Sequence, residues 1–344
     1  MISSENGPEN CIIDCQNLGR GFFFHRSEGA DSVLEGLTIT NGSADEGGGI
    51  YCSSDCNPTI THCAFSVNIA RSVGLEGGTG GGMYNLNNKP TLTNCTFSGN
   101  EAKFGAGMYN SDSSPILTNC TFSENVTVRD GAGMYNDWGN PDITNCIFKG
   151  NSAGDSGGGI YNSSGVLTLA NSIFSGNTAV WNGGAMYNEW SSLTVTNCTF
   201  VGNAADNGNA LALNSSIWSN PSVVEFTNCI LRDNGDEIWN NDDSTITVTF
   251  SNIYVDTRSP WPGEGNIRNN PLFADPENGD YHLKSQAGRW DPASQSWVID
   301  DVTSPCIDSG DPSTPIGMEP PPNGGIINMG AYGGTAQASK SPEN

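Results

Sequence analysis

Positive charge is scarce in this chain. Lys and Arg make up 13 of its 344 residues, whereas Asp and Glu make up 37, so the formal net charge at pH 7 is −24. Nucleic acids and anionic membranes are bound by clusters of basic side chains, and this balance argues against both as partners. A polyanionic substrate would also be repelled unless a divalent cation lay between the two.

Long apolar segments are missing too. No run of residues is long enough for a membrane-spanning helix, so we expect no membrane insertion. Residues 1–6 contain neither the basic region nor the apolar core of a signal peptide. A long repeat protein with few Lys is nevertheless typical of the space outside the cell. We therefore expect an extracellular or cell-surface protein whose natural N-terminus lies upstream of Met1.

Metal-binding motifs are absent. The three His are scattered, no Cys-x-x-Cys pair occurs, and no Gly-Gly-x-Gly-x-Asp calcium nonapeptide is found. The carboxylates of residues 275–280 lie near a Gly but lack the full pattern of a calcium loop. We therefore predict no metal site and no cofactor. Calcium binding is kept as an alternative that no motif supports.

The chain is rich in one repeated pattern. Gly105-Ala-Gly-Met-Tyr-Asn110 is followed by Pro115-Ile-Leu-Thr-Asn-Cys-Thr-Phe-Ser-Glu-Asn125, and both halves recur on either side. The Cys position of the second half steps through residues 120, 146, 172 and 198, which is a period of 26 residues. A period of this length without helical patterning is typical of a solenoid.

Each repeat predicts one winding of three short strands. Cys95 and Phe97 alternate as in a strand. Leu92 lies three residues before Cys95, so one residue has been added where the chain bends. Asn94 sits at this bend and tolerates the left-handed conformation that a tight bend needs. The predicted winding is therefore strand, Asn bend, strand, loop, and a third strand at Gly-Met-Tyr.

Stacking the windings about 4.8 Å apart would place equivalent residues on top of each other. Three buried ladders are predicted: one of Phe rings, one of Asn amides bonded from winding to winding, and one of reduced thiols acting as small apolar groups. Cys52 and Cys56, which lie in a turn, are better candidates for a disulfide than Cys11 and Cys15. The ladders are Phe65, Phe97, Phe122, Phe148, Phe174 and Phe200; Asn68, Asn100, Asn125, Asn151, Asn177 and Asn203; and Cys95, Cys120, Cys146 and Cys198, with Ser172 in one place.

The motif Gly-Gly-Ala/Gly-Ile/Met combined with Phe-x-x-Asn, as at residues 97–100, 148–151 and 174–177, resembles the repeat of the polymorphic outer-membrane proteins. More broadly, residues 10–255 resemble the right-handed parallel β-helices of the pectin-lyase-like superfamily. The resemblance implies an all-β, right-handed parallel β-helix solenoid of about nine windings with a loop-rich C-terminal cap. It leaves function open, because this superfamily includes lyases, hydrolases, epimerases, adhesins and structural stalks.

Composition divides the chain into two segments. Residues 1–257 are the predicted β-helix, with irregular first windings at 1–46, regular repeats at 47–205 and looser last windings at 206–257. Residues 258–344 hold twelve of the 18 Pro. We predict that this segment forms a cap, because an open solenoid end exposes unpaired strand edges.

An aromatic stripe is the main candidate for binding. Where the third strand reads Gly-Met-Tyr, the Ile or Met should face the core, so the Tyr should face outward along roughly 25 Å at the strand spacing. Sugar rings stack on exposed aromatics at such spacing; the alternative is that the Tyr shield the strand edge and the Trp and Phe seal loops. The predicted glycan-binding residues are Tyr84, Tyr109, Tyr135, Tyr161, Tyr187, Phe104, Trp138, Trp181 and Trp190.

Catalytic groups are few. A lyase needs a base beside a uronate, and a glycosidase needs two carboxylates about 5–9 Å apart. Arg129, Asp130 and Asp155 form the one mixed cluster on regular repeats, and solvated turn residues are the alternative interpretation. We therefore expect a non-enzymatic extracellular or cell-surface module for adhesion or neutral-glycan binding. A polysaccharide lyase or glycoside hydrolase, and a purely structural stalk, are the two alternatives; no oligomeric state is predicted.

Overall fold

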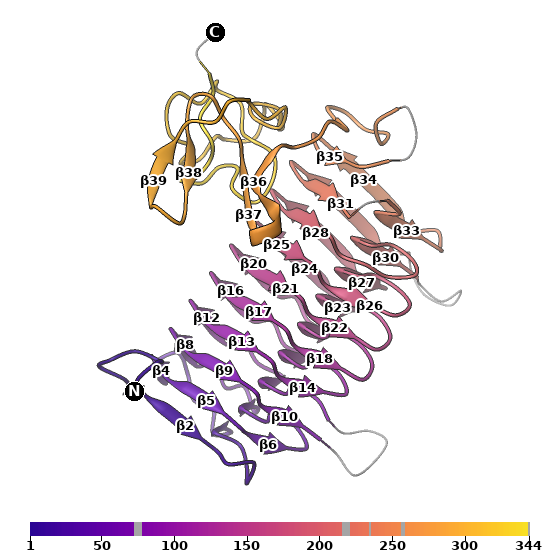
Figure 1. Ribbon diagram of the computed structural model, residues 1–344. Coiled ribbons are helices and arrows are strands. Elements are labelled where there is room, and N and C mark those ends of the chain that lie inside the picture. Colours follow the sequence, from indigo (N-terminus) through magenta and orange to yellow (C-terminus); the bar gives the residue numbers. More distant parts are fainter. Residues whose placement is uncertain (72–77, 215–220, 234, 256–258, 343–344) are drawn as a thin grey trace.

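The computed structural model describes residues 1–71, 78–214, 221–233, 235–255 and 259–342. The chain winds as a solenoid from the indigo N-terminal strands to the orange ones, and the golden C-terminal segment lies beside its upper end (Figure 1). We call each complete winding a rung. The spacing of the repeats also predicts one longer loop at residues 71–78. Most of that loop, and the boundary predicted after residue 257, lie outside the described residues.

Within the described residues, the rungs contribute strands to three long parallel sheets, A, B and C. The predicted all-β solenoid of three strands per rung is therefore confirmed. Sheet A consists of β1 (Ile2–Ser3), β4 (Val33–Glu35), β8 (Thr59–Thr61), β12 (Thr91–Thr93), β16 (Ile116–Thr118), β20 (Asp142–Thr144), β24 (Val166–Ala170), β28 (Ser192–Thr196), β31 (Val223–Thr227) and β34 (Thr245–Thr249). Sheet B consists of β2 (Ile12–Asp14), β5 (Thr38–Thr40), β9 (Ala64–Ser66), β13 (Thr96–Ser98), β17 (Thr121–Ser123), β21 (Ile147–Lys149), β25 (Ile173–Ser175), β29 (Thr199–Val201), β32 (Ile230–Arg232) and β35 (Asn252–Ile253).

A fourth sheet, D, was not predicted. Its two-residue strands lie in the loop between sheets B and C, where stacked loops pair with each other for a short distance. Sheet C consists of β3 (Phe22–Phe24), β7 (Ile50–Cys52), β11 (Met83–Leu86), β15 (Met108–Ser111), β19 (Met134–Asp137), β23 (Ile160–Ser163), β27 (Met186–Glu189), β30 (Leu211–Leu213) and β33 (Ile238–Asn240). Sheet D consists of β6 (Ser43–Ala44), β10 (Ile69–Ala70), β14 (Glu101–Ala102), β18 (Val126–Thr127), β22 (Ser152–Ala153) and β26 (Thr178–Ala179).

The parallel register places equivalent residues directly on each other, for example Phe97 on Phe122. The predicted Phe ladder is fully buried, and its ring centroids are 4.6–4.9 Å apart. The bends between sheets A and B are left-handed, as predicted, with φ of 55° at both Asn94 and Asn119. The ladder of Asn68 and its equivalents is also confirmed, because each amide donates to the next at 2.8–3.2 Å.

Sheet C holds a second buried amide ladder that the repeat pattern did not predict. The residue after each Tyr faces inward, and these Asn are 0–1% exposed. Asn85 donates to Asn110 at 2.8 Å, and Asn110 donates to Asn136 at 2.7 Å. Each such bond is worth about 1 kcal/mol, and an unpaired buried amide would cost more than that. The two ladders therefore join neighbouring rungs through polar groups inside a core that is otherwise apolar, although the second ladder is interrupted between Asn136 and Asn162.

The eleven cysteines are all free thiols. The predicted ladder thiols are buried among the Phe rings, and Ser172 fills one place by donating to the Ala170 carbonyl at 2.9 Å. The disulfide considered between Cys52 and Cys56 is not formed. Instead the Cys56 thiol donates to Glu28 Oε2 at 2.9 Å.

The C-terminal segment does more than close the last rung. Trp261 packs against the open end of the core, but the following residues run back along the outside of sheet B. There Tyr281 and Ala331 cover Ile173, while Leu283 and Met329 cover Ile230. Its secondary structure comprises β36 (Phe273–Asp275), the 3-10 helix η1 (Pro276–Asn278), β37 (Asp280–Leu283), β38 (Arg289–Asp291) and β39 (Ser296–Val298).

A buried acidic pair ends the first amide ladder. Asp233 stands where the next Asn would be, and its Oδ1 accepts hydrogen bonds from the backbone and side chain of Asn203. The Glu237 carboxylate accepts the Asp233 backbone N–H at 2.9 Å, and both side chains are 3% exposed. Burial, and then repulsion by Glu237, raise the pKa of Asp233, and burial raises the pKa of Glu237 to about 7.

The acidic pair predicts that the protein loses stability as pH rises. The folded state holds protons that the unfolded chain has already released, so stability is fully present below the unfolded pKa of Glu237, about 4.5, and is lost as pH rises towards 7. Asp233→Asn removes the repulsion and keeps the acceptor oxygen for Asn203. We expect the free energy of unfolding of this variant, measured with urea, to exceed that of the wild type by about 1–3 kcal/mol at pH 8 and by less at pH 5. The exposed Asp142→Asn is the control; equal gains in both variants would refute the assignment.

The Phe ladder predicts a contrast between neighbouring positions. Phe122→Ala removes a buried ring stacked on both sides and should cost about 3–5 kcal/mol in urea unfolding. Cys120→Ser should cost much less, because Ser172 already satisfies its hydroxyl at the same place in another rung. A larger loss for Cys120→Ser than for Phe122→Ala would contradict this account of the core.

Candidate binding surface

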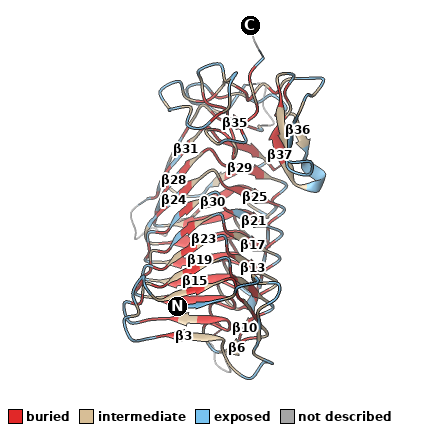
Figure 2. Cartoon of the chain, turned by 90° about the vertical axis from the view of Figure 1, so that its left-hand side faces the viewer, coloured by how far each residue is buried: buried red, intermediate tan, exposed pale blue. Residues whose placement is uncertain are grey.

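The outer face of sheet C carries the predicted tyrosine stripe. Residues along each strand alternate between core and exterior, so the Met of each Gly-Met-Tyr points inward and the Tyr points outward. Met108 and Met134 are accordingly fully buried, while Tyr109 and Tyr135 are half-buried on the outside. Figure 2 looks toward this side of the coil and shows β15, β19 and β23 in red and tan.

The tyrosine rings stack on each other. From Tyr84 to Tyr187, successive ring centroids are 4.6–5.4 Å apart, so each ring covers the face of the next. Tyr84 and Tyr187 are buried, and the three rings between them are half-buried. Burial raises the pKa of all five hydroxyls. A sugar chain lying along this stripe would therefore meet ring edges and hydroxyls rather than ring faces.

Glycine at one loop position allows the backbone to close against these rings. Gly105 has a left-handed φ of 58°, and a Cβ there would lie 2.6 Å from the Met108 carbonyl oxygen and 2.9 Å from Tyr109 Cβ. Gly131 has φ of 65° and the same neighbours one rung later. Any other residue would push the loop away from the ladder, so the repeated Gly before each third strand is required by the close approach.

Other aromatic side chains flank the ladder on both sides. Phe104, before its strand, packs edge-on against Tyr135 with ring centroids 5.7 Å apart. Trp181 also precedes its strand but is 55% exposed, and Trp138 and Trp190 follow theirs with exposures of 67% and 38%. Of the predicted aromatic residues, these three Trp are the most exposed.

Trp138 and Trp190 also share an unusual backbone conformation. Their φ angles are 57° and 53°, in the left-handed region that bulky residues rarely adopt. Neighbouring rungs place Asn87, Asp112 and Ser164 at the equivalent bend, and Asn and Asp tolerate this conformation well. A Trp in this position costs on the order of 1 kcal/mol in backbone strain.

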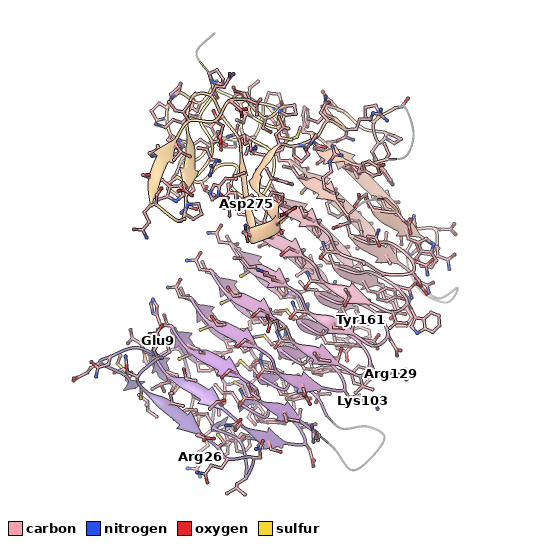
Figure 3. All side chains as sticks on the ribbon, viewed as in Figure 1. Glu9, Arg26, Lys103, Arg129, Tyr161 and Asp275 are labelled. Carbon is pink, nitrogen blue, oxygen red and sulfur yellow. The ribbon has the colours of Figure 1, made fainter. Side chains whose placement is uncertain are left out.

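The three candidate catalytic residues lie together where the loop enters sheet C. The Arg129 guanidinium pairs with the Asp155 carboxylate at 2.5 Å, and Figure 3 shows Arg129 at the same side of the coil as Tyr161. Asp130 accepts the Ser156 backbone N–H at 3.0 Å. Burial raises the pKa of Asp130 to about 6.

Two carboxylates on this face were missed by sequence analysis. Asp137 and Glu189 lie two residues after the Tyr of their strands, so the alternation that turns the Tyr outward turns them outward as well. Tyr161 donates its hydroxyl proton to Glu189 at 2.7 Å. Burial raises the pKa of both carboxyl groups. Among the described residues, no group of three or more His, Cys, Asp or Glu is arranged to hold a metal ion, and no helix is long and apolar enough to cross a membrane.

A family model described as right handed beta helix region matches residues 9–165 and again residues 83–255. The two overlapping matches cover most of the chain, and both end before the C-terminal segment. No curated protein and no solved structure matches the sequence.

The stacked ladder predicts that its central tyrosines stabilise the fold. Tyr135→Ala removes a ring held between Tyr109 and Tyr161 and touched by Phe104, so we expect a loss of about 2–4 kcal/mol in urea unfolding. Trp138→Ala, one residue after the same strand but exposed, is the matched control and should change stability by less than about 1 kcal/mol. If Tyr135→Ala left stability unchanged, the ring would be a surface group available to ligands.

Proposed function

The chain belongs to the right-handed β-helix family, and from this we propose that it is a non-enzymatic module that binds a neutral glycan outside the cell or at the cell surface. The binding surface of this proposal runs along the outer edge of sheet C. It differs from the uninterrupted tyrosine stripe predicted from sequence, because the exposed Trp carry the sugar contacts and the Tyr ladder forms the floor beneath them.

The observation that supports the proposal is the exposed Trp at a left-handed bend. Trp138 and Trp190 follow β19 and β27, and the bend between them holds the small Ser164. Backbone strain of this kind is retained where a side chain has a role beyond stability. Indole rings bind sugars by stacking on their apolar faces, which requires open ring surface, and these two rings have it.

The spacing of the two rings suits a polymer. They lie two rungs apart, which is roughly 10 Å at about 4.8 Å per rung, close to the length of two pyranose units. A glycan lying along the solenoid axis would stack one ring on every second sugar. Hydroxyl groups between them would face Glu189 and the edges of the Tyr ladder. Trp181, on the other flank of the rung that carries Trp190, would border the same track.

Charge favours an uncharged glycan. The net charge of the chain is −24, and the track is bordered by the carboxylates of Asp130, Asp137 and Glu189. An acidic polysaccharide would be repelled along this track, whereas hydroxyl groups of a neutral one can donate to the carboxylates. A scarcity of Lys on a long solenoid is consistent with a place outside the cell or at its surface.

A glycoside hydrolase is the second candidate, and the raised pKa of Asp130 favours it. A carboxylic acid with a pKa of about 6 can donate a proton to a leaving group near neutral pH, with Glu189 or Asp137 as the second carboxylate. A lyase is less well supported, because the Arg129 side chain that would serve as its base is paired with Asp155.

Asn substitutions at the two Trp bends test the glycan proposal. Trp138→Asn and Trp190→Asn remove the rings but keep residues that tolerate the bend, as Asn87 shows. We expect each to weaken retention on neutral polysaccharides by about five- to tenfold, corresponding to about 1 kcal/mol per ring, with unchanged or slightly higher melting temperature. Affinity electrophoresis with soluble neutral polysaccharides, at low and at high salt, measures the retention of both variants. Thermal unfolding measures their melting temperatures.

Asn87→Ala, at the equivalent bend outside the track, is the control and should leave retention unchanged. Equal retention of wild type and the double Trp variant would contradict the proposed track. Release of reducing ends that disappears in Asp130→Asn would contradict the non-enzymatic assignment and favour the hydrolase.

A further inference from the structure

A groove of about 360 Å³ lies on the opposite edge of the solenoid, between the bends that join sheets A and B and the C-terminal segment. Its floor is formed by Asn119, Asn145 and Ile147, and its wall by Tyr332 and Gln337. The side chains that line it are uncharged. Neither the proposed glycan track nor the candidate carboxylates contribute to it.

The C-terminal segment shows how these bends hold a polypeptide. The Asn171 side chain donates its Nδ2 protons to the carbonyls of Ala331 and Gly333, at 3.0 and 2.7 Å. The Asn197 side chain donates in the same way to the carbonyls of Asn328 and Gly330, at 3.0 and 3.4 Å. Each bend amide therefore binds two carbonyls that are two residues apart in a segment made of turns.

The pattern advances by one rung for every three residues of the segment. The segment turns at residues 330–333, where Gly333 donates its backbone N–H to the Gly330 carbonyl, and turns again at residues 332–335, where Thr335 donates its backbone N–H to the Tyr332 carbonyl. The next bend is Asn145, whose exposed side-chain amide has no hydrogen bond within the described residues. The groove thus continues an existing peptide-binding interface at a position where the segment no longer fills it.

The apolar contacts of the interface follow the same course. The first residues of β25 and β32 face outward and are covered by the segment. These residues are Ile173, which is 6% exposed, and Ile230, which is 0% exposed. One rung further, at the start of β21, Ile147 is 37% exposed and lies in the groove. An apolar side chain placed over Ile147 would repeat the contact that Ala331 makes with Ile173.

We propose that this groove binds an uncharged peptide segment of a partner protein. Two of its carbonyls, separated by one residue, accept the Asn145 amide protons, and a small apolar side chain beside them covers Ile147. A peptide is favoured over a sugar because the bend amides already bind backbone carbonyls at two successive rungs. Acidic peptides are disfavoured by the net charge of the chain.

A labelled copy of the segment that already binds such bends is a direct probe. We would titrate the full chain against a fluorescein-labelled peptide with the sequence of residues 326–335 and follow fluorescence anisotropy. The rungs of Asn171, Asn197 and Asn228 are occupied within the chain, whereas the groove at Asn145 is open to this peptide. We expect saturable binding that weakens at least tenfold in Asn145→Ala and in Ile147→Asp.

Asn94→Ala is the matched control, because Asn94 belongs to the same bend ladder but does not line the groove. It should bind the peptide as the wild type does, and so should Trp138→Asn, which separates this result from the glycan proposal. Absence of saturable binding, or equal binding by Asn145→Ala, would overturn the inference. Displacement of the peptide by a neutral oligosaccharide would overturn it in favour of a sugar site, and a dimer of the chain that Ile147→Asp dissociates would overturn it in favour of a second copy.

Discussion

Parallel pairing of each rung with the next is the constraint on which the rest of the structure depends. Because the register places Phe97 on Phe122 and Tyr109 on Tyr135, every residue type must tolerate a copy of itself directly above and below. Aromatic rings and primary amides satisfy this condition, since rings stack and an amide is both donor and acceptor. Carboxylates do not, and the amide ladder ends where Asp233 replaces Asn beside Glu237.

The same constraint explains why a continuous aromatic stripe makes a poor sugar platform. Rings repeated at every rung lie 4.6–5.4 Å apart, which is stacking distance, so they bury one another's faces. A ring keeps an open face only if the neighbouring rungs carry something smaller. Trp138 and Trp190, separated by Ser164, meet that condition, and both accept a strained bend to do so.

Periodic features could be predicted from the sequence because the solenoid repeats them. The strands, the left-handed Asn bends, the Phe ladder and the first amide ladder all follow from spacing alone. Alternation gave the outward direction of Tyr135 but not its stacking, which depends on the ring above and below it rather than on its own strand. The path of residues 259–342 along sheet B has no repeat to reveal it, and its contacts with Asn171 and Asn197 join residues more than 130 positions apart.

Function in such a fold must be sought at the bends and loops rather than on the strands. Strand residues are held to like-on-like stacking, whereas a bend residue can differ from one rung to the next without breaking a ladder. Trp138, for example, stands where the preceding rung has Asp112. Asn145 is left uncovered, whereas the equivalent Asn171 is covered by the C-terminal segment. The two proposed surfaces lie at different bends of the winding, one after sheet C and one between sheets A and B. A ligand at one of these proposed surfaces would therefore leave the other accessible.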